Sequence, residues 1–475
     1  MSPQAGDYTL AYDTDDDLLS IPETDPPDAC QQHAQNAEYL RFYDPDSSMQ
    51  AVKNHIHLRF PSLSVVDVGS TASTDAQMLR SVRLVDGRRL LIHLPSWYRR
   101  PLQHELGSIT QELLNICWLQ SLPKYRSKNQ DRGQAALFSS RPWPPIEATN
   151  FTKDVTNTNH LTGFLPIILH HEYSTSATQR SMDFEIMLSE PPLGTSIPEL
   201  EEALSQRERM SCDWQTGQLF RRIASNISPT GYFGPPAHVL AEHTSMPWLS
   251  DSMAGTYLRS DIGYPSWSEA FGELFYTALE EAGRSRITLP SHKLHVAFER
   301  FRPAFDVVKR PSLVAIDGCE DSQVLVLRRK ESKRYPNSKP GVSEASEDES
   351  TDDAFINIGS FSTDVKVTGL KSWGHFVFGD PLFATCFLNT ASDALIKGMN
   401  TAFSADDPLG DADLVEDPQD AHIRLLFYDI VHTMRGIARQ HKGIRTPDSA
   451  QKEDMWWMRL RKALAKLDDM TAEED

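Results

Sequence analysis

Short apolar runs separated by polar turns dominate the first part of the chain, and they predict strands. The clearest signal is Asp86-Gly87 between two apolar runs. This pair is typical of a tight hairpin because both residues tolerate positive φ. The expected strands cover residues 65–68, the two arms of 81–94, 164–169 and 183–188. The pattern predicts a small antiparallel sheet.

Apolar residues that recur on one helical face predict the helices. Residues 102–122 show this spacing most clearly, with Leu106, Ile109, Leu113, Ile116 and Leu119 on one side. Earlier along the chain we expect a helix at residues 37–57. Beyond residue 194 helices dominate, and we expect them at residues 197–204, 212–224, 267–282, 292–308, 421–439 and 455–467. The chain therefore reads as a sheet with one main helix, followed by a larger helical part.

The composition of successive segments suggests where the domains lie. Residues 1–35 are rich in Asp, Pro and Gln and are expected to form a disordered acidic tail. We expect an N-lobe at 36–190, with an inserted loop at about 123–163, and a helical C-lobe at 191–475. Residues 328–358 are first basic and then acidic and have no apolar periodicity, so we expect a disordered insert there.

Charge and cysteine content narrow the classes of partner. The 475 residues carry a net charge of −19, which disfavours nucleic acid or an anionic membrane as the main partner. The five cysteines are scattered and form no C-x-x-C pair, so neither a disulfide framework nor a zinc site is expected. We find no signal-peptide pattern and no apolar run of transmembrane length. We therefore expect a cytoplasmic protein.

Two stretches in the second half carry the most specific motif. Residues 312–327 read S-L-V-A-I-D-G-C-E-D-S-Q-V-L-V-L, and residues 365–381 read V-K-V-T-G-L-K-S-W-G-H-F-V-F-G-D-P. The order is strand, Asp in a turn, strand, acidic insert, short strand and G-D-P corner. It resembles the catalytic core of the aminoglycoside phosphotransferase / choline kinase-like family. Residues 266–269, S-W-S-E, resemble the S-W-x-E of fungal-type members, so the chain looks like a fungal-type member with degenerate catalytic motifs.

The resemblance runs from about residue 50 to about residue 440 and implies a fold and a chemistry. The implied fold is α+β, a bilobal protein-kinase-like fold with a small N-lobe of antiparallel sheet plus helix and a larger, mainly helical C-lobe. The implied cofactors are ATP and Mg²⁺, and the implied partner is a small-molecule substrate in the cleft between the lobes. Phosphoryl transfer of this kind depends on positioning and on neutralising charge.

In the N-lobe the resemblance points to a phosphate loop and to a cation held by a carboxylate. The loop is 69–75, with Gly69 and Ser70 at its start, although an ordinary β-turn fits this stretch equally well. His93 stands where the family has Lys or Arg, and a histidine is only partly charged near neutral pH. The partner carboxylate is expected on the following helix, at Glu112 rather than Glu105; a solvated surface role is the alternative for Glu112.

In the C-lobe only the catalytic aspartate keeps its identity, at Asp317, while its usual companion histidine is replaced by Ala315. The metal-binding Asn falls at Ser322 by spacing or at Gln323 by alignment of the following strand. Ser372 replaces the metal-binding Asp.

The same turn contributes further carboxylates, Glu320 and Asp321, which could substitute as magnesium ligands or simply be exposed. The G-D-P corner at residues 379–381 is interpreted as structural, a turn that sets the start of the next helix.

Three functional hypotheses follow. In the first, the protein has lost the family's standard ATP/Mg²⁺ phosphoryl transfer and is a pseudokinase that binds a protein partner, or its cleft serves another small-molecule step. In the second, it is an atypical ATP-dependent phosphotransferase acting on a hydroxyl or amine, with Asp317 as base. In the third, it is a scaffold whose cleft is filled by side chains such as Trp97, Phe184 or Phe376.

Overall fold

A computed structural model describes most of the chain between residues 45 and 473. The described ranges are 45–71, 77–95, 108–128, 161–174, 184–240, 263–285, 287–328, 364–389, 391–403, 407–410, 412–442 and 447–473. The chain divides into two units, Met1–Leu63 and Ser64–Asp475. In the first unit the described helix is α2 (Pro45–Arg59), which covers the second part of the helix expected at residues 37–57. The expected tail and most of the two expected inserts lie outside the described residues.

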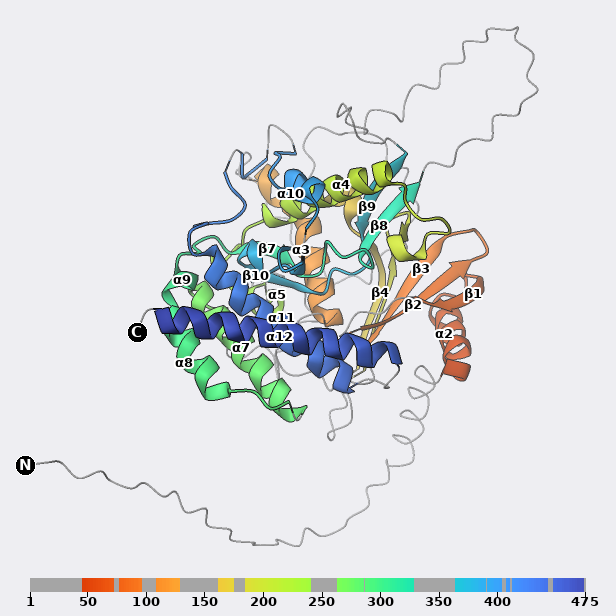
Figure 1. The fold of residues 1–475 in the computed structure, drawn as a ribbon. Helices are drawn as coiled ribbons and strands as arrows, with labels where there is room; N and C mark the ends of the chain where they lie inside the picture. Colours follow the sequence, from red (N-terminus) through yellow and green to blue (C-terminus); the bar gives the residue numbers. More distant parts are fainter. Residues whose placement is uncertain are drawn as a thin grey trace, which may run out of the picture. The chain divides into compact units, whose positions relative to one another are not determined.

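An antiparallel five-stranded sheet opens the second unit, with strand order β1-β2-β3-β5-β4 (Figure 1). The strands are β1 (Val65–Ser70), β2 (Gln77–Leu84), β3 (Arg89–Pro95), β4 (Ile167–Ser174) and β5 (Phe184–Glu190). The predicted sheet is confirmed. The strand expected at residues 164–169 is displaced, because residues 162–164 form the one-turn helix η1 (Thr162–Phe164) before β4 begins.

The hairpin between β2 and β3 differs from the prediction in one detail. Its loop holds three residues, since the Leu84 N–H bonds to the Arg88 carbonyl at 2.9 Å. Gly87 takes a φ of +85°, but Asp86 does not have positive φ. A three-residue loop needs only one left-handed residue, whereas a two-residue loop of type I′ needs two. Asp86 instead accepts a hydrogen bond from the Arg88 N–H at 3.0 Å.

Helix α3 (Ile109–Lys128) contributes a buried face to the core beside this sheet. The predicted apolar face is confirmed for Ile109, Leu113, Ile116 and Leu119, all of which are buried. The helix continues to residue 128, beyond the predicted end at 122. Leu106 and the rest of the predicted first turns lie outside the described residues.

The segment that follows the sheet corrects one prediction. Residues 197–204 do not form an α-helix; they follow β6 (Thr195–Ser196) and contain only the 3₁₀ turn η2 (Ile197–Glu199). β6 pairs with β8 (Val324–Arg328), so the chain enters this segment from an extended strand. Leu200 and Leu204 still pack against the core, so the apolar pattern reflected burial and not helical periodicity.

Helices dominate the rest of the second unit. They are α4 (Gln206–Ala224), α5 (Pro236–Val239), α7 (Trp267–Arg284), α8 (Ser291–Phe301), α9 (Pro303–Asp306), α10 (Asp393–Met399), α11 (Ala421–Lys442) and α12 (Pro447–Glu473). α4 begins six residues earlier than predicted because Ser205 and Glu208 form a capping box. The helix expected at residues 292–308 is divided in two at Pro303, which cannot donate the backbone hydrogen bond of a continuous helix.

Two small antiparallel sheets lie among these helices. β7 (Ser312–Ala315) pairs with β10 (Phe376–Gly379), and β8 pairs with both β6 and β9 (Val365–Leu370). The turns after β7 and after β9 carry the motif residues identified in the sequence. The predicted α+β class is therefore confirmed, with an antiparallel sheet and helix α3 followed by a larger, mainly helical part. None of the helices in the described ranges has the length and apolar character needed to cross a membrane.

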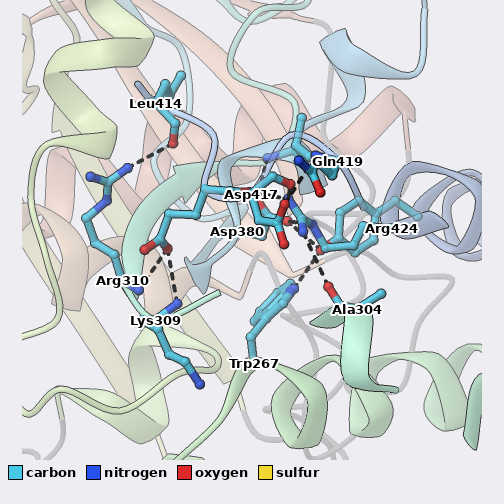
Figure 2. A network of polar contacts seen from close by, with 12 residues as sticks. Trp267, Ala304, Lys309, Arg310, Asp380, Leu414, Asp417, Gln419 and Arg424 are labelled. Carbon is cyan, nitrogen blue, oxygen red and sulfur yellow. Dashed lines mark hydrogen bonds and ion pairs between the residues drawn. The ribbon is translucent and has the colours of Figure 1, made fainter. Parts of the chain in front are cut away.

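The G-D-P corner is a structural turn, as predicted, and its aspartate does more than cap a helix. Asp380 accepts a hydrogen bond from the Leu382 N–H at 3.0 Å, which caps the one-turn helix η3 (Pro381–Phe383). Its other oxygen lies 2.8 Å from Arg424 Nε on α11 (Figure 2). Tyr428 also donates to Asp380, at 2.8 Å, and Trp267 donates to Tyr428 at 2.6 Å.

This buried polar cluster joins the corner to two helices. The Asp380 and Arg424 side chains are 1% and 0% exposed. Arg424 satisfies its remaining nitrogens on backbone carbonyls, at 3.3 Å from Ala304 and 3.1 Å from Asp417 (Figure 2). A buried charge pair of this kind is costly to break because the surviving charge has no water to solvate it.

Replacing Asp380 by Ala should lower the free energy of unfolding by about 3–5 kcal/mol, because Arg424 is left as an uncompensated buried cation. The measurement is the midpoint of denaturant unfolding. As the matched control, Glu280→Gln breaks the exposed Glu280–Arg284 pair and should change stability by less than about 1 kcal/mol. Equal losses of stability in the two variants would show that the buried Asp380 cluster stabilises the fold no more than an exposed ion pair, and would contradict this prediction.

Candidate functional site

The structure brings His93 and Glu112 together, as the resemblance implied. His93 lies on β3 and Glu112 in the first turn of α3, with 3.3 Å between His93 Nδ1 and Glu112 Oε2. Their side chains are 1% and 0% exposed. The other ring contacts are equally internal: Nδ1 lies 2.9 Å from Gln77 Oε1, and Nε2 lies 2.9 Å from Ser189 Oγ. Both ring nitrogens are therefore engaged with buried neighbours.

Glu112 is also tied to the turn after β9. The backbone N–H of Trp373 donates to Oε1 at 2.7 Å, and the Ser372 hydroxyl donates to Oε2 at 3.0 Å. The surface role considered for Glu112 is thus excluded by its complete burial. Burial works to raise the pKa of Glu112, but its interactions with His93 and the Trp373 N–H outweigh this and hold the pKa below its usual value.

The positions expected to hold a metal do not converge on one point. The Ser372 hydroxyl already donates a hydrogen bond to Glu112. The Gln323 side chain is buried with no hydrogen-bond partner for its Oε1, and Ser322 is half-buried. Asp321 pairs with Arg209 of α4 at 2.6 Å. Among the residues that the structure describes, no group of three or more His, Cys, Asp or Glu side chains is arranged to hold a metal ion.

Asp317 lies in the turn after β7 and has a partner that the sequence analysis missed. His375 Nδ1 lies 3.3 Å from Asp317 Oδ2, and both side chains are partly exposed, at 21% and 19%. The antiparallel pairing of β7 with β10, which sets Ala315 opposite Phe376, carries His375 to this place. The sequence shows His375 within the second motif, but only the strand register reveals its contact with Asp317.

Glu320 is placed beside this pair. The Thr385 hydroxyl donates to Glu320 Oε1 at 3.1 Å. The pKa of Glu320 is raised to about 7, first because the surrounding chain displaces water from the carboxylate and second because Asp317 adds a nearby negative charge. The carboxyl group of Glu320 therefore titrates near neutral pH, beside the Asp317–His375 pair.

Only the first part of the expected phosphate loop is described. Gly69 and Ser70 are the last residues of β1, and residues 72–76 lie outside the described ranges. A Cβ on Gly69 would meet no atom within 4 Å, so the local structure does not require glycine there. The next residue, Thr71, donates through its hydroxyl to Glu199 Oε1 at 2.7 Å.

Glu199 itself forms a second ion pair that the sequence analysis missed. Lys371, between β9 and Ser372, places its Nζ 2.8 Å from Glu199 Oε1, and the lysine side chain is 2% exposed. Arg89 NH2 lies 3.5 Å from Glu199 Oε2. The available signal was the lysine directly after the strand, in T-G-L-K-S-W at residues 368–373.

Of the three side chains that were considered as fillers of the cleft, the structure describes only that of Phe376. Trp97 and the side chain of Phe184 lie outside the described residues. Phe376 belongs to the buried core, where its ring stacks on that of Trp373 with 5.4 Å between centroids. It therefore fills the interior of the helical part. Glu105, the second candidate for the helix carboxylate, also lies outside the described ranges.

These residues do not fit a magnesium–nucleotide complex held in the family's way. The strand position offers an internally bonded histidine in place of a free ammonium group. At the expected metal positions, a hydroxyl that is already engaged, that of Ser372, stands in place of an aspartate, and Ser322 or Gln323 stands in place of an asparagine. The orphaned Gln323 oxygen is a single neutral donor, which does not make a divalent-cation site.

Comparisons with known proteins give only remote likenesses. No family model matches the chain, and no curated protein matches it. Solved structures with some likeness include a thermostable mutant of the aminoglycoside phosphotransferase APH(4)-Ia (13% identity, covering 87% of this chain and 98% of that one, TM-score 0.42). A putative fructosamine-3-kinase from Thermobifida fusca is 11% identical, and the match covers 87% of this chain and 98% of that one with a TM-score of 0.42. A macrolide 2'-phosphotransferase type I is 12% identical, and the match covers 87% of this chain and 94% of that one with a TM-score of 0.35. The site is therefore interpreted from its own geometry.

The Glu112 contacts should make stability depend on pH. Glu112→Gln should lower the free energy of unfolding by about 1.5–3 kcal/mol near neutral pH, because hydrogen bonds to a charged acceptor are lost. The folded-state pKa of Glu112 is depressed below the usual 4.5, so its contribution is present above pH 4.5 and is lost as pH falls further. The gap between wild type and variant should shrink on acidification, while exposed Glu201→Gln shows no such gap. A gap that grows with acid would contradict this account.

The raised pKa of Glu320 should depend on Asp317. In Asp317→Asn, the Glu320 pKa should fall from about 7 toward the usual 4.5, because the neighbouring negative charge is gone. Carboxyl-detected NMR titration measures this directly. Asp321→Asn is the matched control and should give the smaller shift, because Arg209 already neutralises Asp321. An unchanged Glu320 pKa in Asp317→Asn would show that the charge of Asp317 does not act on Glu320, and would contradict this prediction.

Proposed function

We propose that the protein is a phosphotransferase-like protein that does not carry out Mg²⁺-dependent phosphoryl transfer from ATP. Its cleft would instead serve as a pseudokinase binding site, for a protein partner or for another small-molecule step. The observation that carries the proposal is the closed set of contacts around Glu112. His93, Ser372 and the Trp373 N–H all point at this carboxylate.

The first step of the argument concerns the phosphate anchor. A lysine would offer an ammonium group with three donors, whereas His93 offers two ring nitrogens at most. Both nitrogens are engaged, with Gln77 and Ser189 as well as Glu112. Releasing one of them to a phosphate would leave a buried polar group unpaired, at a cost of about 1–3 kcal/mol for each group.

The second step concerns the metal. Mg²⁺ favours near-octahedral oxygen coordination and is usually bound through carboxylates. Ser372 has no carboxylate, and Asp321 is paired with Arg209. The loss of a phosphate anchor and of a metal ligand together removes two parts that such transfer requires. The net charge of −19 and the partly exposed Asp317 are compatible with the binding of a small molecule or protein.

One observation favours a second function. Asp317 and His375 stay partly exposed and close together, with Glu320 beside them. An accessible carboxylate beside a histidine is the arrangement expected of a general base. The second candidate is therefore an atypical ATP-dependent phosphotransferase acting on a hydroxyl or amine, in which Asp317 accepts the proton and Glu320 or Asp321 contacts the metal.

The two functions separate in one experiment. The purified protein is incubated with ATP and Mg²⁺ and a panel of small alcohols and amines, beside Asp317→Ala. The proposal expects no phosphorylated product from either protein, and no rise in melting temperature that ATP gives only when Mg²⁺ is present. Product formation by wild type that Asp317→Ala abolishes, with the variant still folded, would overturn the proposal and establish the second function.

A further inference from the structure

Side chains from separate segments converge on the carboxylate of Glu199. Thr71 follows β1, Arg89 opens β3 and Lys371 follows β9. Thr71 Oγ1 and Lys371 Nζ lie 2.7 and 2.8 Å from Oε1, and Arg89 NH2 lies 3.5 Å from Oε2. The cluster thus links the sheet part to the helical part through one anion.

The cations of this cluster outnumber the anion that they hold. Lys371 is 2% exposed, and a buried ammonium group is tolerated only when an anion accompanies it. Arg89 supplies a second positive charge beside it. Two cations and the hydroxyls of Thr71 and Ser196 therefore act on a single carboxylate, in a chain whose overall charge is −19. The place is built for an anion, and it has charge left over for one of higher valence.

Glu199 is the member that can leave. It is the last residue of the three-residue turn η2, and its side chain is 29% exposed, in contrast to Lys371. Burial works to raise its pKa, but hydrogen bonds from Lys371 and Thr71 outweigh this and lower the pKa to about 2. Glu199 is therefore an anion throughout the physiological pH range. Its contacts here are made by the side chain, so rotation about side-chain bonds is enough to vacate the place.

We propose that Glu199 is the internal occupant of an anion-binding site, and that a small phosphate-bearing molecule binds there by displacing it. Lys371, Arg89 and Thr71 would hold the phosphate without a metal ion. A phosphate group carries up to two charges and three terminal oxygens, so it satisfies an ammonium, a guanidinium and a hydroxyl together better than one carboxylate does. The proposal is independent of the loss of Mg²⁺-dependent transfer, because His93 and Ser372 take no part in it.

Binding of inorganic phosphate and pyrophosphate to the full chain tests this proposal. Calorimetric titrations are run in EDTA at constant ionic strength, which removes metal-dependent binding and non-specific screening effects. Glu199→Gln should bind pyrophosphate at least about tenfold more tightly than wild type, because the competing charge is gone. Lys371→Met should bind at least about tenfold more weakly. Arg83→Gln, which removes an exposed arginine from the same sheet, should match wild type.

Two further variants keep the test decisive if Glu199→Gln folds poorly. Glu199→Asp keeps the charge on a shorter side chain, so it should gain affinity to a smaller extent. The double variant Glu199→Met with Lys371→Met replaces the ion pair by apolar groups; it should stay folded and fail to bind. Affinities of Glu199→Gln and Glu199→Asp no greater than that of wild type would overturn the proposal and leave Glu199–Lys371 as a structural ion pair.

Discussion

One buried carboxylate, that of Glu112, joins the parts of the structure that matter for function. It accepts hydrogen bonds from Ser372 and from the Trp373 N–H and lies beside His93, so it fixes α3 to β3 and to the turn after β9. A buried charge is tolerated only when its hydrogen-bonding capacity is filled. The buried contacts that stabilise the fold therefore also occupy both ring nitrogens of His93 and the Ser372 hydroxyl.

The position of the partly exposed acid–base group follows from this constraint. Asn115, one turn along α3 from Glu112, donates to the Trp373 carbonyl at 2.8 Å, so both sides of the Trp373 peptide are held by α3. The Ile316 N–H bonds to the His375 carbonyl at 3.0 Å, which sets His375 beside the Asp317 turn. Asp317 and His375 remain at the surface because the buried bonds end at the backbone next to them. The protein therefore combines a buried histidine, His93, whose ring nitrogens are both engaged, with a partly exposed Asp317–His375 pair.

Sequence patterns predicted the elements well where local rules decide the structure. The sheet, the buried face of α3 and the G-D-P corner followed from alternation, helical spacing and turn residues. The pattern failed at residues 197–204, where the apolar side chains pack against the core but only the 3₁₀ turn η2 forms. The sequence also did not predict the contact of His375 with Asp317 or the Lys371–Glu199 ion pair. These contacts depend on strand register and on residues far apart in the chain.

The ring nitrogens of His93 offer the most direct measurement of whether the anchor is closed. Long-range ¹H–¹⁵N NMR spectra of the protein, labelled at histidine, are recorded before and after addition of excess ATP and Mg²⁺. The account predicts that both His93 nitrogen signals stay in place, because Gln77, Glu112 and Ser189 continue to hold them. A nucleotide-dependent shift of the His93 signals that saturates with ATP–Mg²⁺ would show that the histidine meets the phosphates, and would contradict the account.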